Sequence, residues 1–195
     1  MGVVEALQEA SVTLRGSHPR WPPPSERDYS EVERLLGRKP VGRFFVVARR
    51  NSRQGIPAVI ACWPIIAPDK PMPTLFWLVD AELNYRVAQV ESRGAIVAAR
   101  AGVDPEKLEN AHRRYRELRD GLIPSDYVGP QPRGGIGGTG SGVKCIHAHV
   151  AFEVVGGNDP VVAWVNDNFG AEIDLGNLFF DELPPGLGSL ERSRG

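Results

Sequence analysis

The order in which two hydrophobic patterns follow each other along the chain is the strongest constraint on its fold. Between Val41 and Asp80, three runs rich in β-branched and aromatic residues are separated by short turn-rich segments: VGRFFVVARR, PAVIACWPII and PTLFWLVD. Such runs at short spacing indicate antiparallel strands. From Leu83 onward, apolar residues recur at helical intervals instead. The sequence therefore predicts an α+β fold, a single domain in which a three-stranded antiparallel meander packs against several helices.

Proline and glycine residues divide the rest of the chain. Residues 1–28 contain the proline-rich stretch SHPRWPPPSERD and are expected to form a flexible N-terminal arm. Ser30 and Glu33 have the spacing of a capping box at the start of a short helix that stops at Gly37. Asp104 is expected to cap a long helix through about Leu122. The α+β domain then covers residues 29–169, and residues 170–195 are expected to be a surface or disordered tail.

Charge and composition exclude several classes of partner. A formal net charge of −1 gives no overall field to attract nucleic acid, so no nucleic-acid binding is expected. No apolar run approaches the roughly 18 residues that a membrane span needs, so no membrane insertion is expected. The chain has two cysteines, Cys62 and Cys145, and no signal peptide is apparent, which favours reduced thiols in the cytoplasm.

The segment GGIGGTGSGVKCIHAHVAF, residues 134–152, carries most of the ionisable chemistry. Its glycines satisfy the literal pattern G-x-G-x-x-G, but no strand precedes them and no helix follows directly, which disfavours a nucleotide-binding fingerprint. A helix is expected over Val143 to Val155. Glycines that free backbone N–H groups at its start, next to Lys144, suit a phosphate or carboxylate, so Gly140, Gly142 and Lys144 are predicted to bind an anion. The alternative is an ordinary loop with a surface lysine.

Within that helix, the spacing separates the ionisable side chains. Cys145 and His149 are one turn apart and share a face, whereas His147 falls on the apolar stripe. A helix N-terminus, Lys144 and a neighbouring base favour a reactive thiolate, so Cys145 and His149 are the candidate catalytic pair, and His147 is a candidate ligand contact. A buried structural cysteine is the alternative.

Three polar residues interrupt the apolar face of the long helix after Asp104. His112, Tyr115 and Arg119 recur at spacings of three and four. They either line a pocket shared with the Cys145 helix, as ligand-binding residues, or form a structural hydrogen-bond network. In either case they are predicted to lie within contact range of the Val143 to Val155 helix.

The sequence offers few metal ligands at recognisable spacing. Cys145 and His149 could supply two, but no second C-x-x-C or H-x-x-x-H element completes a tetrahedral site. No metal is therefore expected, and the sequence indicates no particular cofactor.

Four segments of the chain are similar to a known family. The run VKCIHAH after the glycine loop, with PMPTLFWL, AHRRYRELR and GGNDPVVAWV, resembles the small bacterial family catalogued as domain of unknown function 501, over roughly Tyr29 to Val165. The resemblance implies a bacterial cytosolic protein and brings no activity with it. Many relatives carry a cysteine-rich turn that reads Asn51 to Gly55 here and has no thiol. The motif positions are Pro73, Thr74, His112, Tyr115, Arg119, Lys144, Cys145, His147, His149 and Pro160.

Two functions of different classes follow from these patterns. The first is the binding of a small phosphorylated or carboxylated ligand at the glycine loop and the Lys-Cys-x-His-x-His helix, with catalysis as an extension. The second is a non-enzymatic interaction module that engages a protein partner through an exposed tryptophan, either Trp21 or Trp164, and the family resemblance implies a link to cell division.

Overall fold

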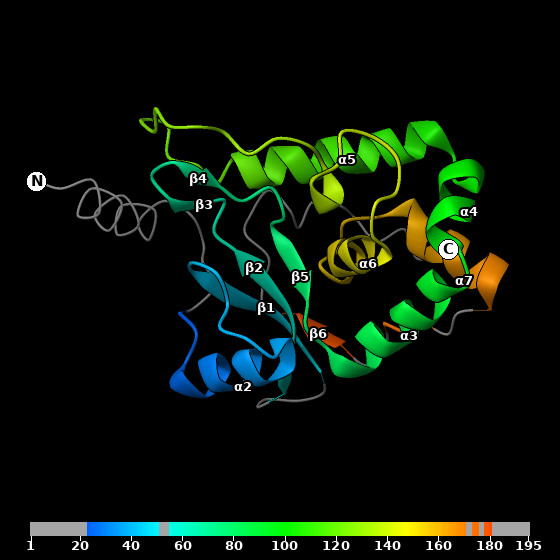
Figure 1. Ribbon diagram of the computed structural model, residues 1–195, viewed down its shortest axis with the longest axis horizontal. Helices are drawn as coiled ribbons and strands as arrows, with labels where there is room; N and C mark the ends of the chain where they lie inside the picture. The colour runs from blue at the N-terminus through cyan, green and yellow to red at the C-terminus, as the bar shows by residue number, and fades with distance from the viewer. Residues whose placement is uncertain (1–22, 51–54, 171–172, 176–177, 181–195) are drawn as a thin grey trace, which may run out of the picture.

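The computed structural model describes residues 23–50, 55–170, 173–175 and 178–180, and Figure 1 shows their arrangement. The predicted three-stranded antiparallel sheet is confirmed as β1 (Phe44–Arg50), β2 (Ile56–Cys62) and β5 (Phe76–Leu78). A small hairpin of β3 (Ile65–Ala67) and β4 (Lys70–Pro71) lies between β2 and β5 in the chain.

A fourth strand extends this sheet from the C-terminal side of the chain. β6 (Leu178–Phe180) pairs antiparallel with β1, which makes the strand order β5-β2-β1-β6. These residues fall in the segment that the sequence assigned to a surface or disordered tail, so this edge strand was missed. Ile173, just before it, is buried in the core.

The helices are arranged on both faces of the sheet. Alternate residues of β2 point to opposite faces, and Ile60 and Cys62 pack with Val32 of α2 (Glu26–Leu36), whereas Val59 and Ala61 belong to the main core. The other helices contribute to that main core (Figure 1): α3 (Ala81–Ser92), α4 (Ala95–Gly102), α5 (Pro105–Asp120), α6 (Ile146–Val154) and α7 (Pro160–Phe169). Because both faces are covered, β2 is almost wholly buried.

Capping residues place the helix ends, and one end differs from the expectation. Asp104 caps α5 as predicted, since its carboxylate accepts hydrogen bonds from the backbone N–H groups of Glu106 and Lys107. α2, however, starts within the predicted arm: Ser25 and Asp28 form its capping box, and the predicted cap Ser30 lies inside the helix. Asp28 also accepts a hydrogen bond from Arg49 of β1, which ties this helix start to the sheet.

The helix that carries the chemical motif is shorter than expected and lies near the centre of the fold. α6 begins at Ile146 rather than at Val143, and Cys145 is its N-cap with extended backbone angles (φ −154°, ψ 120°). Ile146 and Val150 are fully buried, and α6 contacts β5, α3 and α7. Across the described ranges, no helix is long and apolar enough to span a membrane.

Candidate functional site

The Cys145 thiol lies where the glycine loop enters α6, and its neighbour is His147. The Cys145 Sγ is 3.8 Å from the Nδ1 atom of His147. The predicted pairing of Cys145 with His149 is wrong, because Cys145 has an extended backbone and the helical rotation of about 100° per residue starts only after it. Because α6 begins three residues later than predicted, the partner of Cys145 is His147 rather than His149.

A carboxylate from α3 completes this group. The Oε1 atom of Glu91 lies 3.2 Å from the His147 Nδ1, and it also accepts a hydrogen bond of 2.6 Å from the backbone N–H of Ile146. The other ring nitrogen of His147, Nε2, donates to the backbone carbonyl of Asn84 at 3.3 Å. We call Glu91, Cys145 and His147 the thiol cluster. Sequence reasoning missed Glu91, since no motif or spacing relates it to a helix 55 residues further on.

Electrostatic interactions within the thiol cluster favour a protonated His147 and an ionised Glu91. Burial lowers the pKa of His147, but its hydrogen bonds with Cys145 and Glu91 outweigh burial and raise that pKa to about 10. Burial raises the pKa of Glu91, and the bonds from His147 and the helix backbone more than reverse this effect, so its pKa is lowered. All three side chains are partly exposed.

The start of α6 already holds an anionic group. The helix start was predicted to offer free backbone N–H groups to an anion, but at the observed start the N–H of Ile146 donates to Glu91. Lys144 precedes the helix and is exposed, and it forms no ion pair with any residue that the structure describes. Arg100 of α4 lies against Gly142, and its Nε donates to the carbonyl of Val143. The structure therefore brings Lys144 and Arg100 to the same end of the loop.

The two glycines predicted to bind the ligand have different surroundings. Gly142 has a positive φ of 69°, a conformation that favours glycine, and its carbonyl accepts a hydrogen bond from His112. Gly140 has open space where a side chain would stand. Only the first of these positions requires glycine for the observed backbone.

The three polar residues of α5 form a buried network that holds backbone groups. His112 donates from Nε2 to the Gly142 carbonyl at 3.0 Å and accepts at Nδ1 from the backbone N–H of Ile136, also at 3.0 Å. The Tyr115 hydroxyl accepts from the backbone N–H of Leu75 at 2.5 Å. Arg119, which is 1% exposed, donates to the carbonyls of Pro73, Pro132 and Gly134. These contacts favour the structural network that the sequence left open.

The predicted proximity of this network to α6 is confirmed for two of its three members. The His112 ring lies 5.8 Å from the His149 ring, and the Tyr115 ring lies 5.2 Å from that of Phe152. The contacts of Arg119 run instead to the loop at residues 132–134 and to Pro73.

His149, the predicted catalytic base, belongs to the buried side of α6. Its side chain is fully buried, and Nδ1 donates to Asp159 Oδ2 at 2.7 Å. The other carboxylate oxygen of Asp159 caps α7 through the backbone N–H of Val161. The Nε2 atom of His149 has no hydrogen-bond partner among the described residues. The His149–Asp159 pair therefore joins α6 to α7.

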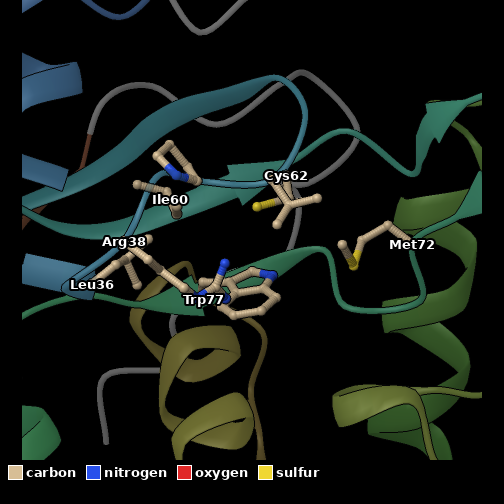
Figure 2. A pocket seen from close by; sticks show the side chains of 8 residues that line it. Leu36, Arg38, Ile60, Cys62, Met72 and Trp77 are labelled. Carbon is tan, nitrogen blue, oxygen red and sulfur yellow. The ribbon is translucent and has the colours of Figure 1, made fainter. Parts of the chain in front are cut away.

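A shallow pocket lies elsewhere, between the end of α2 and strands β2 and β5 (Figure 2). Its lining is mostly apolar, with Ile60, Met72 and Trp77, and it contains none of the predicted site residues. The Cys62 thiol also lines it, and burial raises the pKa of this thiol to about 12. Burial therefore keeps Cys62 in the unreactive thiol form.

The predicted tryptophan anchors find little support. Trp164 is partly buried and packs against Phe169, with its ring close to Gly102. Trp21 lies outside the described residues.

Comparison with known proteins gives one result. The model of a family described as "Protein of unknown function (DUF501)" matches residues 47–167, which is more than half of the chain. No curated protein and no solved structure matches the chain.

Proposed function

The chain belongs to the DUF501 family of proteins of unknown function, and we propose that it binds a small anionic molecule where the glycine loop joins α6. The observation that carries this proposal is that Arg100 binds the backbone carbonyl of Val143, immediately before the exposed Lys144 and the partly exposed Cys145. Two cations at one loop end attract phosphate or carboxylate groups.

The structure changes how such a ligand would be held. Because Glu91 occupies the backbone N–H of Ile146, the ligand would contact the side chain of Lys144 rather than the helix N-terminus. A ligand held by lysine and arginine side chains pairs with them as charges, so its affinity should fall steeply with added salt.

Any chemistry on the bound ligand would fall to the thiol cluster. Cys145 and His147 are in contact with each other and partly exposed, while His149 is fully buried and committed to Asp159. The pair that supports catalysis is therefore Cys145 with His147, in place of the pair expected from helical spacing.

Thermal unfolding in the presence of anions tests the proposal. Phosphate, polyphosphate and guanosine or adenosine nucleotides are added at low ionic strength, with sulfate as the control for general screening. A ligand that binds only the folded state adds about 2.7 kcal/mol at a hundredfold excess over its dissociation constant. We expect at least one anion to raise the melting temperature of the wild type and to do so much less in Lys144→Ala.

Lys70→Ala is the matched control, because Lys70 is an exposed lysine on β4. It should respond to the anion as the wild type does. Equal stabilisation of the wild type and Lys144→Ala by every anion would show that Lys144 holds no ligand.

A further inference from the structure

The three ligand atoms of the thiol cluster have the spacing of a metal site. A carboxylate oxygen of Glu91, the Sγ of Cys145 and a ring nitrogen of His147 all lie within 4.8 Å of one another. In a tetrahedral zinc site, bonds of about 2.0 Å to nitrogen and oxygen and about 2.3 Å to sulfur place nitrogen about 3.3 Å from oxygen and about 3.5 Å from sulfur. The corresponding distances here are 3.2 Å and 3.8 Å.

Neighbouring groups orient these atoms as they do around bound metals. The Nε2–H of His147 donates to the Asn84 carbonyl, so in the neutral ring the lone pair of Nδ1 faces Glu91 and Cys145. Metal-bound histidines usually donate their second ring nitrogen to a carbonyl or carboxylate in this way. The backbone N–H of Ile146 fixes the Glu91 oxygen. Both orienting groups belong to the backbone, so they persist in any side-chain variant.

From this convergence we propose that Glu91, Cys145 and His147 bind one Zn²⁺ ion and leave its fourth coordination position open. One nitrogen, one oxygen and one sulfur ligand suit zinc. When the ion binds, the Cys145 thiol and the protonated His147 ring each release a proton to solvent, and the thiolate sulfur and the freed Nδ1 lone pair form bonds to the metal.

The proposal replaces the sequence-based expectation of no metal. That expectation counted only Cys145 and His149, which share a predicted helical face. The structure exchanges one histidine for the other and adds Glu91 from α3, so the count becomes three ligands on two elements.

An open position would also explain where an anionic ligand binds. The charges of the thiolate and the Glu91 carboxylate cancel that of the ion, so the cluster would not repel an anion, and the adjacent Lys144 would attract one. In this respect the inference deepens the proposed function, and only the role of the ion in anion binding rests on that function, because metal binding can be measured without any anion.

The experiment uses the full chain without an affinity tag, stripped of metal with a chelator and titrated with Zn²⁺ in competition with a chromogenic chelator. We expect one ion per chain. Co²⁺ should replace it and give the near-ultraviolet absorption of a thiolate–cobalt bond, together with the intense visible bands of tetrahedral cobalt. Cys145→Ser should lose the thiolate band, and Glu91→Gln and His147→Gln should weaken binding at least about tenfold.

Cys62→Ser is the matched control, since it removes the other thiol of the chain, and it should keep both affinity and spectrum. Circular dichroism establishes that each variant is folded. Unchanged zinc affinity in Cys145→Ser, or failure of the wild type to bind an ion stoichiometrically, overturns the metal site. Anion stabilisation that depends on Lys144 in chelator-treated protein would then still support the proposed function, and zinc binding without any anion effect would leave the metal site standing alone.

Discussion

His147 and His149 lie two residues apart on α6, and their surroundings differ in kind. His149 is fully buried, and its bond goes to a carboxylate that caps the next helix. His147 is partly exposed and shares its Nδ1 atom between a thiol and a carboxylate. The first arrangement commits a polar group to the fold. The second brings three potential ligand atoms together among partly exposed side chains, so one face of α6 belongs to the core and the other carries the proposed site.

The buried side also supports the exposed one. His112 and Arg119 bind the carbonyls of Gly142 and Gly134, at the two ends of the glycine loop that leads to Cys145. The loop passes so close to α5 that a side chain at Gly135 would meet the His112 ring. The network of α5 therefore fixes the path of the loop, and through it the position of Lys144 and Cys145. Variants of the α5 network should therefore lower the free energy of unfolding, whereas variants of the thiol cluster should weaken ligand binding.

The largest loss of stability is expected from Arg119→Met. Methionine retains much of the apolar stem but leaves the carbonyls of Pro73, Pro132 and Gly134 without their donor in a buried position. Each unsatisfied buried group costs about 1–3 kcal/mol, so we expect the free energy of unfolding in urea to fall by about 3 kcal/mol or more.

Arg113→Met on the same helix is the control for this measurement. The Arg113 side chain is 59% exposed, and its nearest carboxylate, that of Glu117, is 3.8 Å away. Its removal should change stability by less than about 0.5 kcal/mol. Similar losses in the two variants would mean that the carbonyl contacts of Arg119 contribute nothing to the fold.

The two histidines give the sharpest matched pair. His149→Gln weakens the bond to the buried Asp159 carboxylate and should lower the free energy of unfolding by about 2 kcal/mol, as for other hydrogen bonds to charged groups. His147→Gln, measured with metal removed by chelator, should lower it by less than about 1 kcal/mol, because its contacts are partly solvated.

Ligand measurements should reverse that order. His147→Gln should lose zinc affinity, whereas His149→Gln, once shown to be folded, should keep it. Zinc affinity lost in His149→Gln and kept in His147→Gln would return the site to the pairing that helical spacing suggested.

The sequence predicted those features that depend on local pattern. The three strands followed from β-rich runs between turn segments, and the start of α5 from Asp104 beside a proline, whose carboxylate caps the helix as expected. β6 has only three residues and pairs with a strand more than 120 positions earlier, so no local signal identifies it. The cap of α2 is Ser25 rather than the predicted Ser30, and the contact of Asp28 with Arg49 stabilises the earlier start.

The candidate site was predicted in its residue types and missed in its partners. Cys145 and His147, both named as candidates, contact each other at the loop end, whereas the predicted partner of Cys145 was His149. The pairing failed because it depends on the first residue of α6, and sequence periodicity does not determine a helix end to within three residues. Glu91 enters through tertiary packing of α3 on α6, which only the fold supplies.

The smallest expected effect is a pH dependence that belongs to the buried network. Burial lowers the pKa of His112 from its ordinary value of 6.5, and the neighbouring His149 adds to this effect, while the hydrogen bond to the Gly142 carbonyl and the charges of Asp159 and Glu109 oppose it without reversing it. The geometry agrees, because Nδ1 accepts the Ile136 N–H and must keep its lone pair. The fold thus favours the neutral ring.

The preference of the fold for neutral His112 makes stability depend on pH. Its contribution to the free energy of unfolding is fully present above the pKa of His112 in the unfolded chain and is lost as pH falls through the pKa in the folded protein. Between about pH 7.5 and about pH 5.5 the loss can reach no more than about 1.4 kcal/mol. Urea unfolding of wild type and His112→Gln at both pH values isolates it, since the two proteins differ only at this side chain. We expect the free energy of unfolding to fall less in the variant than in the wild type when the pH is lowered. An equal fall would show that protonation of His112 does not destabilise the fold.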